Sequence, residues 1–110
     1  MLTGMPSPPA PAPAPAFAFQ AALWRHEGGG GAWWFLTVPF DVCDDIEEAT
    51  SVRGGFGSIR VEAMVGASVW RTSLFPSTRA RSLILPVKKS VRAAEGLAEG
   101  GAVEVSVTVI

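Results

Sequence analysis

The sequence feature that most restricts the fold is an alternation near the C-terminal end. From 103 to 109, valine occupies every second position, with Glu, Ser or Thr between the valines. An apolar residue at every second position is typical of a strand with one buried face. At a free sheet edge such a strand would be a template for aggregation. We therefore expect the sheet to close around it as a barrel.

Strand periodicity, or an aromatic and β-branched composition, marks five further segments. They are 17–24, 33–38, 58–65, 68–75 and 79–85;. Two short helices are expected as well, one from Asp41 to about Thr50 and one from about Val87 to a stop at Gly96. The predicted fold class is mainly β: a single closed or nearly closed six-stranded barrel, mostly antiparallel, with two short helices.

The turn between the third and fourth of these strands predicts a hairpin register. Gly66-Ala67 has glycine first, as a type II′ turn requires;. Val65 then pairs with Ser68, and Glu62 faces Arg71 on the outer side of the hairpin.

Buried stripes are predicted for both helices, and one buried indole for the second strand. Asp41 is the expected N-cap of the first helix. The predicted stripes are Val42, Ile46 and Ala49 in the first helix, and Val87, Val91 and Ala94 in the second;. Because neighbours on a strand point to opposite faces, either Trp33 or Trp34, but not both, should be fully buried.

The 110 residues divide into a leader and one domain;. Residues 1–16 are rich in proline and alanine, and proline provides no backbone donor for a sheet or helix. We expect 1–16 to be a disordered leader and 17–110 to form one small β-barrel domain.

Charge and cysteine usage bear on location and partners. The net charge is −1, which makes nucleic acid an unfavourable partner. The lone Cys43 excludes an internal disulfide, and neither a secretory signal nor a membrane-spanning run is present. The cytoplasm is therefore the expected location. Acidic residues gather at 41–48, whereas 53–92 carries roughly +7;, a surplus that arginines on the wet face of a barrel would also explain.

Residues for catalysis or metal binding are sparse. The only histidine, His26, has Glu27 beside it and a glycine run after it. One His and one Cys do not supply the three or four ligands of a zinc site without further acids. No phosphate-binding loop or dinucleotide motif occurs. We predict no catalytic residue, no metal and no cofactor.

The best candidate site is the start of the second predicted helix. Lys88, Lys89 and Arg92 lie within two turns of it, although the helix dipole favours acidic residues there. Lys88 and Arg92 are four residues apart and can point to the same side. Together with free N–H groups they would suit a phosphate or carboxylate. Two alternatives are lysines that splay into water and lysines that pair with the acidic first helix.

Three motifs resemble those of a known bacterial family. They are Gly57–Glu62 (GSIRVE), Trp70–Pro76 (WRTSLFP) and Leu85–Arg92 (LPVKKSVR). In this order they resemble the family catalogued as domain of unknown function nineteen-hundred-five, from about Phe17 onwards. The resemblance implies a small β-barrel with two helices and no established activity. The chain departs from the usual pattern at Gly100-Gly101, where the family has Gly-Asp, and at Ser77, where it carries an acid.

These observations predict a non-enzymatic small β-barrel that binds an anionic small molecule or a protein partner. Two alternatives stay open. The segment from Leu83 to the valine strand also resembles half of the swapped-hairpin DNA-binding regulators, and an enzyme of unrecognised mechanism is the other.

Overall fold

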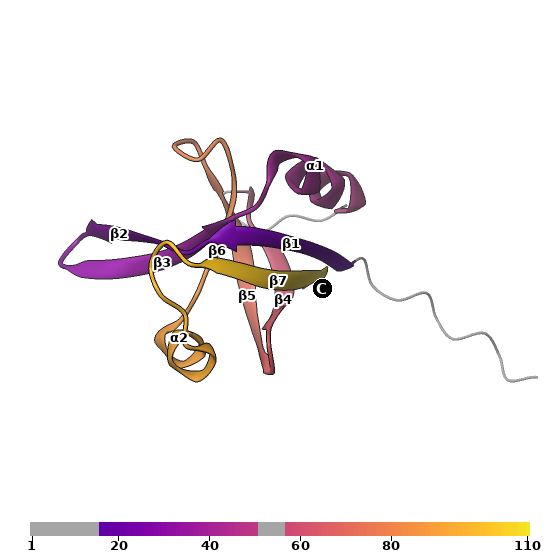
Figure 1. The fold of residues 1–110 in the computed structure, drawn as a ribbon. Coiled ribbons are helices and arrows are strands. Elements are labelled where there is room, and N and C mark those ends of the chain that lie inside the picture. Colours follow the sequence, from indigo (N-terminus) through magenta and orange to yellow (C-terminus); the bar gives the residue numbers. More distant parts are fainter. Residues whose placement is uncertain (1–15, 51–56) are drawn as a thin grey trace, which may run out of the picture.

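A computed structural model describes residues 16–50 and 57–110 (Figure 1). Its strands are β1 (Ala16–Ala22), β2 (Trp24–Gly28), β3 (Gly31–Thr37), β4 (Ile59–Val65), β5 (Ser68–Ser77), β6 (Ser82–Pro86) and β7 (Ala102–Val109). Its helices are α1 (Phe40–Ala49) and α2 (Lys89–Glu95). Ala16, placed in the leader from the sequence, begins β1. Residues 1–15, the rest of the predicted leader, lie outside the described residues.

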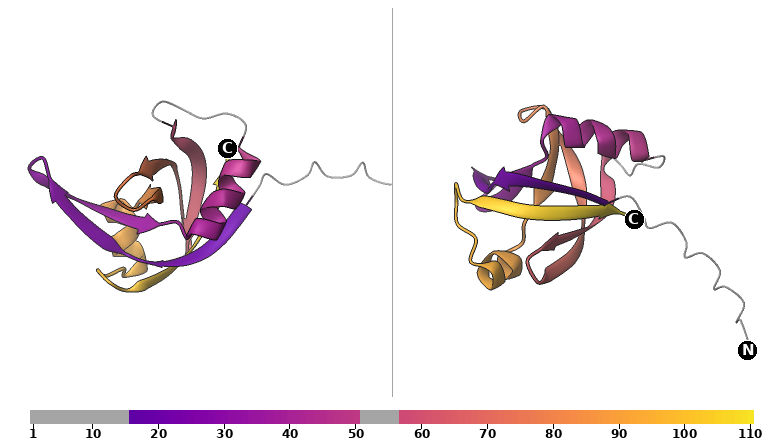
Figure 2. Two further views of the ribbon diagram at one scale, coloured as in Figure 1. Left: turned by 90° about the horizontal axis from the view of Figure 1, so that it is seen from above. Right: turned by 45° about the vertical axis from the view of Figure 1, so that its right-hand side comes forward.

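The seven strands form one antiparallel sheet in the order β1-β7-β4-β5-β6-β3-β2. The prediction of a mainly β fold with two helices is confirmed, but six strands and a closed barrel are wrong. The described sheet ends at β1 and β2 and is an open half-barrel, a curved shell in Figure 2. The valine strand β7 is nevertheless paired on both sides, with β1 and β4.

The extra strand arises because the predicted strand 17–24 divides at Leu23. Residues before it pair with β7, and those after it pair with β3. The Leu23 backbone bonds to the turn before β7: its N–H donates to Gly101 (3.0 Å), and its C=O accepts from Gly100 (2.7 Å). One chain segment thus supplies both ends of the sheet. Its alternation continues through the bend, so the sequence pattern did not reveal the change of partner.

The core lies on the inner side of the curved sheet and under α1. Side chains with no exposed surface come from α1, from β3 and the residue after it, and from β4 to β7. They are Leu36, Val38, Ile46, Ile59, Val61, Ala63, Leu74, Leu85 and Val107. In Figure 1, α1 lies above the strands β1 and β7, and α2 lies below them; the second view in Figure 2 agrees. The two helices therefore cover different parts of the sheet.

The predicted hairpin register of β4 and β5 is confirmed. Val65 pairs with Ser68, and Glu62 pairs with Arg71. Gly66 has φ +58°, as the first central residue of a type II′ turn requires. Arg71 Nε lies 3.5 Å from Glu62 Oε2, with side chains 69% and 42% exposed.

This exposed ion pair is expected to contribute at most about 1 kcal/mol to the free energy of unfolding, because water screens both charges. The measurement is a double-mutant cycle with Glu62→Ala, Arg71→Ala and the double variant, followed by urea denaturation. A coupling energy well above about 1 kcal/mol would contradict the expectation.

The helix starts and the buried stripes differ in part from the prediction. Helix α1 begins at Phe40, before the predicted start, and α2 begins at Lys89, after it. Pro39, not Asp41, precedes α1, and Asp41 lies in its first turn. Ala49, which was predicted to be buried, is exposed, and Cys43, which lies outside the predicted stripe, is buried. The reason is that the stripe facing the sheet, Cys43 and Ile46, follows i, i+3 spacing rather than the i, i+4 pair Val42 and Ile46; Val42 is only half-buried.

In α2, Val87 and Val91 are buried as predicted, but Val87 precedes the helix and Ala94 is exposed. The predicted stop is confirmed: Gly96 is left-handed (φ +63°), and the Leu97 N–H donates to the Arg92 C=O at 2.9 Å;.

Two strand predictions need correction. The strand predicted over 79–85 begins only at Ser82, because 78–81 form a turn and β5 extends through Ser77. Neither Trp33 nor Trp34 is fully buried: Trp33 is 58% exposed and Trp34 is half-buried. The two rings do alternate between faces, but β3 continues beyond the core into the β2–β3 hairpin, where no element in 16–50 or 57–110 buries the outer ring, Trp33.

Candidate functional site

The candidate site lies where the end of β6 joins α2 beside β3. Val87 follows β6 directly, and its N–H donates to the Trp34 C=O at 2.8 Å. The β3–β6 ladder pairs Phe35 with Pro86 just before this bond. These backbone bonds hold the beginning of α2, and with it the basic residues, against the inner side of β3.

A contact between a cation and an aromatic ring joins Arg92 to Trp34 at the site. The Arg92 guanidinium carbon lies 4.6 Å from the centre of the Trp34 ring, a distance typical of a cation–π contact. Arg92 is half-buried. Its Nε is buried and has no hydrogen-bond partner, and among the described residues no carboxylate pairs with this arginine. A partly desolvated positive charge therefore lies on an aromatic face, and the part of the chain that the structure describes provides no counter-charge for it.

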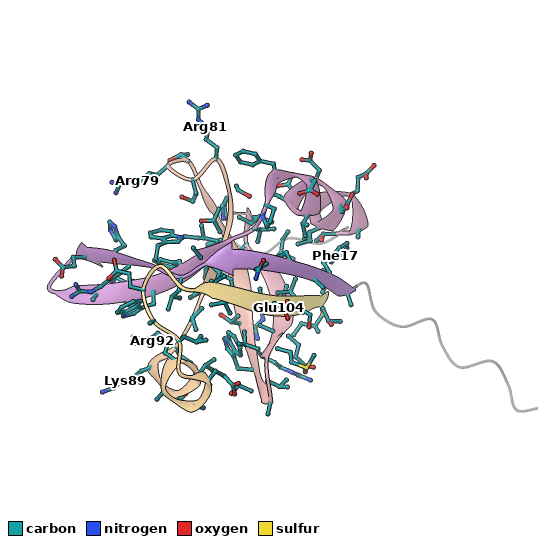
Figure 3. The ribbon with its side chains drawn as sticks, viewed as in Figure 1. Phe17, Arg79, Arg81, Lys89, Arg92 and Glu104 are labelled. Atoms are coloured by element: carbon teal, nitrogen blue, oxygen red, sulfur yellow. The ribbon has the colours of Figure 1, made fainter. Side chains whose placement is uncertain are left out.

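A cleft of about 330 Å³ opens beside this pair. Its walls include three cations predicted from the sequence and residues from β3 and β5. Lining residues include Trp34, Trp70, Val87, Lys88, Lys89 and Arg92. The structure thus brings Lys88, Lys89 and Arg92 to one cleft. Figure 3 shows Lys89 and Arg92 on the α2 side of the molecule.

The predicted conflict between these cations and the helix dipole holds only in part. Lys88 is the N-cap residue and Lys89 the first helical residue of α2, but Arg92 lies in the last turn, where a cation is favoured;. With seven residues, α2 is also too short for its dipole to carry a site. An anion in the cleft would therefore be bound by side chains and not by the helix dipole.

Pairing of the lysines with the acidic helix does not occur among the described residues. Lys88 and Lys89 are exposed and form no ion pair there. The acid-rich α1 lies on the other side of β1 and β7 from α2 (Figure 1). The sequence alternative in which α1 neutralises the basic cluster is therefore wrong.

Two residues near the cleft were not among the site residues predicted from the sequence. Trp70 is 6% exposed and lines the cleft from β5. Arg25, opposite Trp34 in the β2–β3 ladder, has its guanidinium carbon 5.9 Å from the Trp34 ring and pairs with Glu27 at 2.6 Å. The position of Arg25 could have been predicted from the sequence. A hairpin with its turn in the middle of the glycine run 28–31 places Arg25 opposite Trp34.

The match to a family model covers most of the chain. The model described as "Domain of unknown function (DUF1905)" matches residues 19–107. The chain belongs to the DUF1905 family. The match confirms the resemblance seen in the three motifs. It extends from β1 to β7, so this DUF1905 domain contains the whole cleft. No curated protein matches the chain.

Other chemistry-bearing residues of the DUF1905 domain do not gather into a site. His26 is exposed on β2 and pairs with Trp33. Cys43 is buried, and its thiol lies 3.8 Å from Glu47 Oε1. Within 16–50 and 57–110, no three His, Cys, Asp or Glu side chains are placed to share a metal ion. The described helices include none long and apolar enough to cross a membrane.

Proposed function

We propose that this DUF1905 protein is a non-enzymatic domain that binds a small anionic molecule in the cleft beside α2. Arg92 makes the central contact, Lys88 is a second direct contact, and Lys89 assists. The observation that carries the proposal is the half-buried Arg92 guanidinium on Trp34, which lacks a counter-charge among the described residues.

The partial burial of Arg92 explains why an anion would gain more from it than from the exposed arginines. Removing a charge from water is unfavourable unless a partner compensates it. The Trp34 ring compensates part of this cost, but an aromatic face replaces few of the hydrogen bonds that a guanidinium makes in water. The free N–H donors of Arg92 therefore suit a carboxylate or phosphate, which arginine binds through paired hydrogen bonds.

The two lysines add charge at the rim of the same cleft. Both are exposed and unpaired among the described residues, so they keep their hydration until a ligand arrives. Such rim charges attract an anion and speed its association, and they lose this effect as salt rises. Binding should accordingly weaken with ionic strength, although less than for an anion held by exposed charges alone.

The test is isothermal titration of the full chain at low salt with inorganic phosphate, phenyl phosphate and phenylacetate. We compare the wild type with Lys88→Glu/Arg92→Glu. The matched control is Arg79→Glu/Arg81→Glu, which changes the net charge equally on the side of the molecule away from Arg92 (Figure 3). The first variant is expected to lose at least about tenfold in affinity, equivalent to about 1.4 kcal/mol, and the control less than about twofold.

Two results would contradict the proposal: saturable binding of none of the three anions, or an equal loss of affinity in both charge-reversed variants. A short DNA duplex serves as a further probe. Salt-dependent binding of DNA that both variants weaken equally would favour the DNA-binding regulator instead.

A further inference from the structure

We propose that the anion recognised in this cleft carries its charged group on a flat aromatic ring. This inference rests on the proposed function, since it names the class of ligand for the same site. The shared chemistry is an aromatic body with a carboxylate or phosphate attached, and the experiment below separates the two head groups.

The first argument is the composition of the cleft walls. Trp34 lies on the same face of β3 as the buried Leu36, and Trp70 lies on the same face of β5 as the buried Leu74;. Both indoles therefore belong to the inner side of the sheet, where the core ends and the cleft begins. Pro86 and Val87 add further apolar surface. A cleft built only for a hydrated ion has no need of these apolar walls.

The second argument is the shape of the surface at the charged end. The Arg92 guanidinium and the Trp34 indole are both flat groups, and they lie over one another at 4.6 Å. Flat groups stack best on other flat groups, because aromatic rings and guanidinium planes meet with large contact areas at little conformational cost. An aromatic ring can lie against one of these flat groups while its acidic substituent reaches Arg92 or Lys88.

The third argument is size. The cleft holds about 330 Å³, the lower end of the range for small-molecule sites. Inorganic phosphate or acetate would fill a small part of it and leave the half-buried Trp34 ring in contact with water. A single ring with one acidic group fills it better, and a polymer would not.

The experiment compares matched ligands on the unmodified full chain by isothermal titration. One series is acetate, cyclohexylacetate and phenylacetate, and the other is inorganic phosphate and phenyl phosphate. We expect each aromatic ligand to bind at least about tenfold more tightly than the ligand of its series that lacks a ring, and phenylacetate to bind several-fold more tightly than cyclohexylacetate. The two aromatic ligands compared with each other show which head group the site prefers.

The outcomes separate this inference from the proposed function. If ring-bearing and ring-free anions bind equally and Lys88→Glu/Arg92→Glu weakens both, the anion site stands and the aromatic inference is overturned. The inference also fails if cyclohexylacetate and phenylacetate bind equally, because apolar bulk rather than flatness then decides. If no ligand binds, the proposed function fails and this inference with it.

A variant tests whether the aromatic ring of the ligand lies in the cleft beside Trp34. Trp34→Leu is expected to abolish the preference for aromatic ligands, whereas Phe40→Leu, which removes an exposed ring from α1, should keep it. Because Trp34→Leu also removes the support of Arg92, a second measurement uses the wild type. On titration with phenylacetate, the indole N–H resonances of Trp34 and Trp70 should shift, and that of Trp24 should shift much less. Equal shifts of all indoles, or no shift at Trp34, would overturn the placement.

Discussion

Leu85→Ala is expected to lower the free energy of unfolding by about 2–5 kcal/mol. Leu85 has no exposed surface and lies near the end of β6, paired with Leu36 of β3. Removing three buried carbons forfeits their transfer from water and leaves a cavity that the two strands cannot fully close. The total stability of a domain is about 5–15 kcal/mol, so the variant should be only marginally folded at 37 °C.

The measurement is urea denaturation followed by circular dichroism, with Val69→Thr as the control. Val69 is exposed on β5, and threonine keeps the β-branched shape. The control should therefore stay within about 0.5 kcal/mol of the wild type. A loss below about 1 kcal/mol for Leu85→Ala would show that the β3–β6 contact is looser than described, and the placement of α2 beside β3 would then be in question.

Gly66→Ala is expected to cost about 1–3 kcal/mol, for two separate reasons. At φ +58° any residue with a Cβ is strained, typically by about 1–2 kcal/mol. The added methyl group would also meet the Glu95 carboxylate, which accepts a hydrogen bond of 2.7 Å from Ser68 Oγ. Glu95 would have to move away, and the hydrogen bond that connects the β4–β5 turn to α2 would be lost.

The chain contains a second turn glycine with a positive φ and no crowding. Gly29 has φ +60°, and a Cβ there would meet nothing within 4 Å. Gly29→Ala should therefore report the backbone cost without crowding, and it should be less destabilising than Gly66→Ala. In a Glu95→Ala background, the cost of Gly66→Ala should fall, because the crowding against the Glu95 carboxylate is then absent. If the two glycine variants cost the same in the wild-type background, contact with Glu95 does not limit this turn.

Several features of the fold followed from short stretches of sequence. The β4–β5 register followed from Gly66-Ala67 and the alternation on both sides of it. The end of α2 followed from Gly96 and Leu97, because a left-handed glycine lets the next N–H reach back to Arg92;. In each case residues close in sequence restrict the backbone directly, and the tertiary structure keeps the local conformation that they favour.

Other features depended on partners far away in the sequence. The predicted buried faces of α1 and α2 failed at Ala49 and Ala94, since a helix offers several apolar stripes and the sheet decides which one it covers. The strand 17–24 looked continuous, yet β7 and β3 divide it at Leu23. A strand pattern states which face is apolar but not which strand lies beside it.

The candidate site divides in the same way. The sequence alone determined that Lys88, Lys89 and Arg92 lie close together on or next to one short helix and belong to a recognisable family motif. Only the tertiary structure decided that Arg92 lies on Trp34, that Trp70 faces the same cleft, and that the acidic α1 is elsewhere. The spacing of residues along a helix is local, so it can be predicted from the residues beside it in the sequence. Which aromatic ring a cation contacts depends instead on how distant strands pair and on where the open sheet ends.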